Sequence, residues 1–475
     1  MIEKNFERLG NMQNLITMSE YKEEMIEALI SLLRIESTRT DAEPNRPYGK
    51  GLFDALMFMM STAEDMDLDC VNLFGHLGYI DYGEGDDIVA VLTHIDVVPA
   101  GEGWTFPPFD GTVKDGKIYG RGAIDNKGPA IASLFALKAL SDNGVQLNKK
   151  VRLIFGCDEE SGWSDMKYYK EHKTAPSAAF SPDANYPIIN AEKGVLHCAL
   201  KKAVSSNEAN GVLIKGIKCG ERVNIVPNYA ECVLEADKAL IEKAAAVFNE
   251  GQEYEIEVSQ GDEGVLISSH GLSAHGSMPE DGFNAGMNLV MFLNSLPLSS
   301  GTASEIIQSL AAKIGYNYNG EGTPLLLEDE ISGKLTLNLG ILNLDSENVE
   351  CMLDIRYPVS FEESDMISKV EDIFGSVFEV SFAHKLPAIH VAEDSELVTK
   401  LKEAYTEVTG DEAYCFSMGG ATYARAFENA VSFGALFPGE EHVEHGPDEY
   451  IRIDTFIKCA QITANAIMKL ACDEY

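Results

Sequence analysis

Short apolar runs that each end in charged residues are the feature that most constrains the fold of this 475-residue chain. They are DDIVAVLTHIDVVP (86–99), KKVRLIFGCDEESG (149–162) and AAFSPDA (178–184). Each predicts a buried strand that runs into a loop, because the run is short and bounded by charged residues or proline. Between the first two, residues 120–144 predict a Gly-rich loop and then a helix, with Pro129 near its start and Gly144 after its end. This alternation predicts a parallel or mixed sheet covered by helices.

The pattern changes after about residue 194. The segments EYEIEVSQ (253–260) and KLTLNLGILNL (334–344) alternate polar and apolar residues, which predicts antiparallel strands with one solvated face. From about residue 386 the helix and strand signals of the first part return. We therefore predict a discontinuous α/β domain, residues 1–193 and 386–475, with an inserted domain at 194–385. The two halves of the insertion are candidates for related repeats, although they share no evident sequence identity.

Composition excludes several classes of protein. The formal charge of −39 disfavours nucleic acid and anionic membrane surfaces as partners, because both reward clusters of Lys and Arg. No stretch approaches the ~20 apolar residues of a membrane span. Residues 1–14 lack the apolar segment of a signal peptide, and the nine dispersed cysteines form no CxxC pair. These features favour a cytoplasmic protein with reduced thiols.

Acidic and histidine residues gather where the predicted strands end, which is where ligands bind in such sheets. They are His94, Asp96, Asp125, Glu159, Glu160, Asp183 and His445. His94 and Asp96 are two residues apart and point to the same side of the chain, so the carboxylate can orient the imidazole. Glu159 and Glu160 are adjacent, so one can bind a metal while the other takes a proton. The set suits zinc, manganese or cobalt.

This set of residues could perform hydrolysis. Two cations ~3.5–4 Å apart lower the pKa of a bridging water and polarise a carbonyl, and a nearby carboxylate serves as general base. Taken singly, each residue has a simpler interpretation: a strand-end histidine is more often a satisfied polar residue, and an acidic run is usually solvated surface. The combination is more specific, because each member occupies a similar loop position of one fold.

The motifs THIDVVP, GRGAIDNKG, DEESG, SPDA and HGPDE, in this order, resemble the M20 metallopeptidase family. Within that family the chain looks most like long dipeptidases of the PepV type, because the insertion is about 190 residues long and SMGGATYARAF (417–427) matches that subgroup. The resemblance implies a zinc-peptidase-like, mixed-sheet α/β catalytic domain with an inserted α+β lid. It also implies a cis peptide between Asp125 and Asn126.

The resemblance further assigns a role to each residue of the cluster. His94 and Asp183 would bind one metal, Glu160 and His445 the other, Asp125 would bridge them, Glu159 would be the general base, and Asp96 would support His94. The cofactors would be two divalent ions per chain, zinc first, with manganese or cobalt as alternatives.

The insertion carries candidate substrate-binding residues in ERVNIVPN, SSHGLSAHGSMPEDG and MLDIRYP. By resemblance, His275 would bind the scissile carbonyl and its oxyanion, Asn224 would assist, and Arg356 would capture the substrate carboxylate. We expect the backbone N–H groups of Gly419 and Gly420 to help hold that carboxylate, although an ordinary tight turn explains these glycines equally well. His270 and His442 are nearby histidines that could be mistaken for His275 and His445.

The function expected from the resemblance is hydrolysis of dipeptides or short peptides with a free C-terminal carboxylate. One alternative is deacylation of N-acyl amino acids, of the acetylornithine deacetylase or succinyl-diaminopimelate desuccinylase type. Another is a non-catalytic binding relative, which the intact Glu159 and metal ligands disfavour. Because one chain carries the long lid, we expect a monomer.

Overall fold

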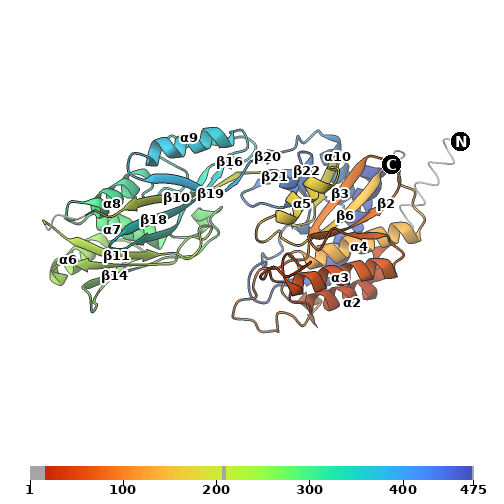
Figure 1. The fold of residues 1–475 in the computed structure, drawn as a ribbon, viewed down its shortest axis with the longest axis horizontal. Coiled ribbons are helices and arrows are strands. Elements are labelled where there is room, and N and C mark those ends of the chain that lie inside the picture. Colours follow the sequence, from red (N-terminus) through yellow and green to blue (C-terminus); the bar gives the residue numbers. More distant parts are fainter. Residues whose placement is uncertain (1–15, 206–209, 473–475) are drawn as a thin grey trace. The chain divides into compact units, whose positions relative to one another are not determined.

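A computed structural model describes residues 16–205 and 210–472 (Figure 1), so the segment 1–14 considered above lies outside the described residues. The chain divides into two compact units. Unit 1 comprises the described residues of Met1–Asn190, Val391–Phe416 and Ala421–Tyr475, and unit 2 comprises those of Ala191–His390 and Ser417–Gly420. The predicted boundaries lie within a few residues of these junctions. The return of residues 417–420 to unit 2 was not predicted.

The main sheet of unit 1 is mixed. Its order is β1 (Cys70–Asn72), β2 (Leu77–Tyr82), β6 (Lys150–Gly156), β3 (Ile88–His94), β7 (Ala178–Ser181), β22 (Ala430–Ser432) and β9 (Ile188–Glu192). The last two residues of β9 belong to unit 2, where they pair with β20 (Ile389–His390). β3 runs parallel to β6 and β7, and β22 runs parallel to β7, whereas β2 is antiparallel to β6. Every residue of β3 is buried, as the unbroken apolar run predicts for a central strand.

Unit 1 contains six α-helices within the described residues. They are α2 (Lys22–Leu33), α3 (Lys50–Asp65), α4 (Lys127–Asp142), α5 (Ser164–His172), α10 (Glu396–Thr409) and α11 (Ile453–Ala471), and α4 is the helix predicted within residues 120–144. α4 begins at Lys127, two residues before Pro129, so the proline occupies the first turn, where its missing N–H costs nothing. Almost all of α4 is buried, and it packs in one core with α2, α11 and strands β3 and β6.

Five short strands of unit 1, in one three-stranded sheet and one pair, lie beside the loops that carry candidate site residues. β4 (Thr112–Lys114), β5 (Lys117–Tyr119) and β24 (Tyr450–Arg452) form a separate antiparallel sheet, and β8 (Ala184–Asn185) pairs with β23 (Ala435–Leu436). The pairing of β24 with β5 brings residues 445–449 next to residues 120–125 of the same unit.

Unit 2 is built on one antiparallel sheet. Its order is β13 (Ile256–Gln260), β14 (Val265–His270), β12 (Tyr229–Glu235), β11 (Leu213–Cys219), β17 (Thr336–Leu344), β18 (Asn348–Tyr357), β10 (Gly194–Ala203) and β19 (Glu379–Leu386). The helices are α6 (Lys238–Phe248), α7 (Ala285–Asn294), α8 (Thr302–Lys313) and α9 (Glu363–Phe374), and their apolar residues share one core with the strands. The predicted antiparallel, α+β character of the insertion is therefore confirmed.

The two faces of β18 differ in chemistry. Leu353, Ile355 and Tyr357 belong to the apolar core, whereas Asp354 and Arg356 point to the opposite face because side chains alternate along a strand. Both polar residues are nevertheless buried. None of the helices in residues 16–205 and 210–472 combines the length and apolar character that a bilayer crossing requires.

Candidate active site

Asp125 lies between two histidines in unit 1. Its Oδ1 atom is 3.0 Å from His94 Nε2, and its Oδ2 atom is 3.0 Å from His445 Nε2. Asp183 Oδ1 lies 3.3 Å from the first histidine, and Glu160 Oε1 lies 3.2 Å from the second. The cluster therefore has two lobes, each with one histidine and one carboxylate, and Asp125 offers one oxygen to each lobe.

The loops that follow the strands produce this arrangement. His94 is the last residue of β3, Glu159 and Glu160 follow β6, and Asp183 follows β7. β3 is parallel to both neighbours, so these three strand ends meet at one edge of the sheet. Asp125 precedes α4 and His445 precedes β24. Six of the predicted residues are thus brought together from loops that are up to 351 positions apart, the separation of His94 from His445.

Asp96 supports this cluster differently from expectation. The Nδ1 atom of His94 lies 3.0 Å from the backbone carbonyl oxygen of Asp96 and 3.3 Å from its Oδ1 atom. Oδ1 makes no hydrogen bond, while Oδ2 accepts one of 2.9 Å from the backbone N–H of Glu160. The Asp96 carboxylate therefore orients the backbone of a predicted ligand, and its carbonyl orients the imidazole.

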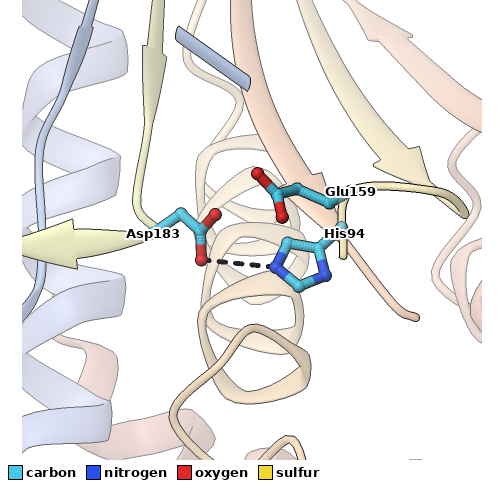
Figure 2. Close-up of side chains that lie close together, drawn as sticks. All are labelled: His94, Glu159 and Asp183. Carbon is cyan, nitrogen blue, oxygen red and sulfur yellow. Dashed lines mark ion pairs between the residues drawn. The ribbon is translucent and has the colours of Figure 1, made fainter. Parts of the chain in front are cut away.

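Glu159 points into the first lobe, beside His94 and Asp183 (Figure 2). Ligand atoms of these three residues all lie within 4.8 Å of one another. Burial raises the pKa of Glu159 well above its ordinary value, and the charge of Asp183 adds to the effect. A carboxylate in this place can either bind a metal or accept a proton from a water beside one, and the geometry is compatible with both.

The cluster's electrostatics favour bound cations. Five carboxyl groups and two histidines share a largely buried space, and burial with nearby negative charge raises the pKa of Glu160 to about 7 and that of Asp183 to about 6. Burial lowers the pKa of His445, but Asp125 and Glu160 together raise it to about 11. Such a concentration of carboxylates is stable only with compensating positive charge.

The distances are also compatible with metal ligation. Ligand atoms ~2.0–2.2 Å from a tetrahedral zinc ion lie roughly 3–3.5 Å from one another, which is the spacing observed here. His94 Nε2 is buried and makes no hydrogen bond with acceptable geometry, despite the carboxylates 3.0 and 3.3 Å away. The residues present therefore fit a pair of divalent cations.

Asn126 is a site residue that sequence reasoning missed. It is fully buried, its Nδ2 atom donates to Pro182 O at 2.7 Å and to Asp183 Oδ1 at 2.9 Å, and its Oδ1 atom accepts from the His94 N–H at 3.3 Å. The side chain thus connects three of the ligand-bearing loops. Its position directly after Asp125 was the available signal. The Asp125–Asn126 peptide is cis, as the resemblance implied.

The candidate substrate residues gather within unit 2. Arg356 donates from Nε and Nη2 to the two carboxylate oxygens of Asp354, at 2.7 and 2.9 Å, and from Nη1 to Gly419 O at 2.9 Å. These three bonds leave two of the five guanidinium hydrogens for a further acceptor. Thr336 and Asn338 of β17 are the cross-strand neighbours of Arg356 and Asp354.

The loop that carries His275 lies on this polar face. Gly276 N donates to Asn224 O at 2.7 Å, and a Cβ atom at Gly276 would lie 2.5 Å from Asp354 Oδ2. His275 Nδ1 lies 2.6 Å from Ser277 Oγ and accepts from the Ser277 N–H at 3.2 Å. A nitrogen that accepts a backbone N–H carries no proton itself, so the neutral ring carries its proton on Nε2.

The two glycines expected to bind a carboxylate differ in their surroundings. A Cβ atom at Gly419 would lie 2.7 Å from Ser277 Cβ, so only glycine fits there. A Cβ atom at Gly420 would make only ordinary contacts. His270 lies elsewhere, 3.8 Å from Glu257, and the exposed His442 contacts Glu444 at 2.8 Å, so neither belongs to the clusters described.

A mixed-sheet α/β unit with a two-lobed His and carboxylate cluster, interrupted by an antiparallel α+β unit, defines a class of metal-dependent hydrolases. The model of Peptidase family M20/M25/M40 matches residues 90–469, and the chain belongs to this family of hydrolytic metallopeptidases. The chain is 38% identical over 461 residues to the "Putative dipeptidase YtjP" of Bacillus subtilis (strain 168), which covers 95% of this chain and 98% of that protein.

Solved structures show the same fold at low sequence identity. Human carnosine dipeptidase 1 is 16% identical, with a TM-score of 0.57 over 95% of this chain and 98% of that chain. The dipeptidase Dug1p of Saccharomyces cerevisiae is 13% identical, with a TM-score of 0.58 over 95% and 96% of the two chains. The predicted fold class, a catalytic α/β domain with an inserted lid domain, is therefore confirmed.

Proposed function

We propose that this protein hydrolyses the peptide bond of dipeptides or other short peptides that have a free C-terminal carboxylate. The observation that carries the proposal is the position of Asp125, with one oxygen 3.0 Å from each of two histidines in a cluster rich in carboxylates. The dipeptidase names of the relatives, including the protein from Bacillus subtilis, supply the substrate class.

In the proposed site, His94 and Asp183 would hold one divalent ion, Glu160 and His445 would hold the other, and Asp125 would contribute to both. When bound, the two ions would lower the pKa of a water and polarise the scissile carbonyl; zinc suits the ligand set best, and manganese or cobalt are alternatives. Glu159 takes a proton from the attacking water and returns it to the leaving amine, a role that suits a carboxyl group with a raised pKa.

Unit 2 supplies the substrate contacts in this proposal. Arg356, held by Asp354 and Gly419 O, directs its two remaining hydrogens at the substrate carboxylate. His275 donates from Nε2 to the carbonyl oxygen as it gains negative charge, and Asn224, which is linked to the same turn through Gly276, assists. The Gly419 and Gly420 N–H groups would complete the carboxylate site.

The Glu159→Gln variant tests the general base. It keeps the size of the side chain and removes its basicity, so we expect turnover of a dipeptide to fall by about 10²–10⁴-fold. Metal content, measured by elemental analysis, should stay at two ions per chain. A drop to one ion per chain would identify Glu159 as a metal ligand, and full turnover would refute the mechanism.

A substrate panel tests the reaction class. Metal-loaded protein is compared on dipeptides, on the same dipeptides with an amidated C-terminus, and on N-acetyl and N-succinyl amino acids. We expect cleavage of the free dipeptides, and loss of activity on the amidated ones because Arg356 loses its ionic partner. Preferential cleavage of the N-acyl compounds would instead indicate a deacylase.

A further inference from the structure

The loops that carry Asp125 and His445 are joined by a buried ion pair outside the predicted metal ligands. Arg121 and Glu449 are 1% and 0% exposed, and Arg121 Nη1 donates to Glu449 Oε2 at 2.7 Å. Burial of two charges is costly unless their remaining polar atoms are also bonded. The other hydrogen bonds of the Glu449 carboxylate and the Arg121 guanidinium therefore show which loops the ion pair holds in place.

The Glu449 carboxylate is enclosed by the backbone of the Asp125 loop. Its Oε1 atom accepts from the N–H groups of Ile124 and Asp125 at 3.0 and 3.2 Å, and its Oε2 atom accepts from the Gly122 N–H at 3.0 Å. With Arg121, this gives the carboxylate four donors. Since one of them is the N–H of Asp125 itself, the position of Glu449 sets the position of the residue that lies between the two histidines.

The Arg121 guanidinium contacts the other loop. Its Nη2 atom donates to the carbonyl oxygens of His445 and Ala100, at 3.0 and 3.2 Å, and its Cζ atom lies 5.2 Å from the ring centre of Trp104. His445 has a φ angle of 61°, in the left-handed region that residues with a side chain adopt only when their surroundings enforce it. The bond from Arg121 is one of the contacts that hold this backbone in place.

We infer that Arg121 and Glu449 are positioning residues that set the distance between Asp125 and His445, and so define the second metal lobe. The continuous path runs from the Asp125 N–H through Glu449 and Arg121 to the His445 carbonyl. The lobe formed by His94 and Asp183 receives no contact from this pair among the residues the structure describes. Loss of the pair should therefore weaken the site of His445 and Glu160 more than the site of His94 and Asp183, because both sites share Asp125 but only the first of them contains His445.

This inference rests on the proposed two-metal site and is tested on the metal-free protein by titration with Zn²⁺ against a chromophoric chelator. In Glu449→Gln an NH₂ group replaces one carboxylate oxygen and cannot accept from the donors on that side. We therefore expect one Zn²⁺ affinity to fall by about 10–100-fold, as for other residues that orient metal ligands. The other affinity should fall less, because that site shares only Asp125 with the affected loops. Arg121→Lys keeps the charge but loses the forked contact to His445, so we expect a smaller loss at the same site.

A matched control is available in the same unit. Arg152 and Asp81 form a partly buried bidentate pair, with both bonds at 2.7 Å, between strands β6 and β2, and neither residue belongs to the metal cluster. Asp81→Asn should lower the unfolding temperature, as Glu449→Gln does, and leave both Zn²⁺ affinities unchanged. If Glu449→Gln does not fold, Arg121→Lys alone decides the question.

Two outcomes separate the inference from the proposed function. If the unmodified protein does not bind two Zn²⁺ ions, the two-metal site is wrong. If it binds two and both affinities are retained in Glu449→Gln and Arg121→Lys while stability falls as in Asp81→Asn, the ion pair is only structural and the inference is wrong.

Discussion

Asp354 binds one edge of the Arg356 guanidinium with both carboxylate oxygens, through hydrogen bonds of 2.7 Å from Nε and 2.9 Å from Nη2. Both residues lie on the polar face of β18, two positions apart, so the strand itself brings the carboxylate and the guanidinium together. A charged side chain that is already ordered loses little rotational freedom when it binds a carboxylate. The proposed capture of the substrate thus depends on two residues, although the sequence motif drew attention to one.

Replacement of Asp354 by Asn should weaken substrate binding more than chemistry. The amide can accept only one of the two Arg356 bonds, so we expect KM for a free dipeptide to rise about tenfold or more, with a smaller change in kcat. Steady-state kinetics check this result. Asp81→Asn, which breaks a similar bidentate pair in unit 1, serves as the control and should leave KM unchanged. An unchanged KM in Asp354→Asn would show that Asp354 does not orient the guanidinium.

His197 should make unit 2 less stable in mild acid. It lies 3.6 Å from Asp354, with Arg356 and His384 as the other charged or titratable groups nearby, and burial lowers its pKa to about 4. Between about pH 6.5 and pH 4 the unfolded chain binds a proton that the folded chain does not, so stability falls as the pH falls. The expected loss is on the order of 1–3 kcal/mol.

The measurement compares thermal unfolding of the unmodified protein and His197→Gln at pH 7 and pH 4.5. Because all other groups titrate in both proteins, the difference between the two pH effects isolates His197. The unmodified protein should lose more stability on acidification than the variant. Equal losses would mean that His197 has an ordinary pKa in the folded state.

Removal of metal should destabilise unit 1 selectively. The carboxylates of the cluster repel one another without cations, and ions that bind only the folded state stabilise it by mass action. We expect a chelator to lower the unfolding temperature, and Zn²⁺, Mn²⁺ or Co²⁺ to restore it. In Asp125→Asn, which loses the charge between the two histidines, elemental analysis should find fewer than two ions per chain. Two tightly bound ions in this variant would contradict the bridging role.

The protein should be a monomer in solution. The metal cluster, His275 and Arg356 are all encoded in one chain, and the long insertion is the feature that led us to expect no partner lid. Sedimentation equilibrium over a range of concentrations should give the mass of one 51.9 kDa chain. An obligate dimer whose activity is restored by mixing a Glu159→Gln chain with a His275→Ala chain would show crossed active sites instead.

The sequence by itself determined the fold class and the change from mixed α/β to antiparallel α+β character along the chain, and it singled out seven candidate site residues. Strands and helices can be predicted because their signals depend on neighbouring residues. The apolar run at 88–94 and the amphipathic run at 396–409 are examples. The ordered motifs and their resemblance to the M20 family then pointed to His94, Asp125 and His445 as candidate metal ligands.

Only the tertiary structure decided which atoms meet. Asp125 is 320 positions from His445, yet one of its carboxylate oxygens faces His445 and the other faces His94. Glu449 and Arg121 hold the two loops through hydrogen bonds that no local sequence pattern predicts. Asn126 and Asp354 escaped sequence reasoning for the same reason, because an Asn or Asp becomes a positioning residue only through its long-range contacts. Hydrogen bonds and ion pairs require about 3 Å between two atoms in space, and this distance does not depend on how far apart the two residues are in the sequence.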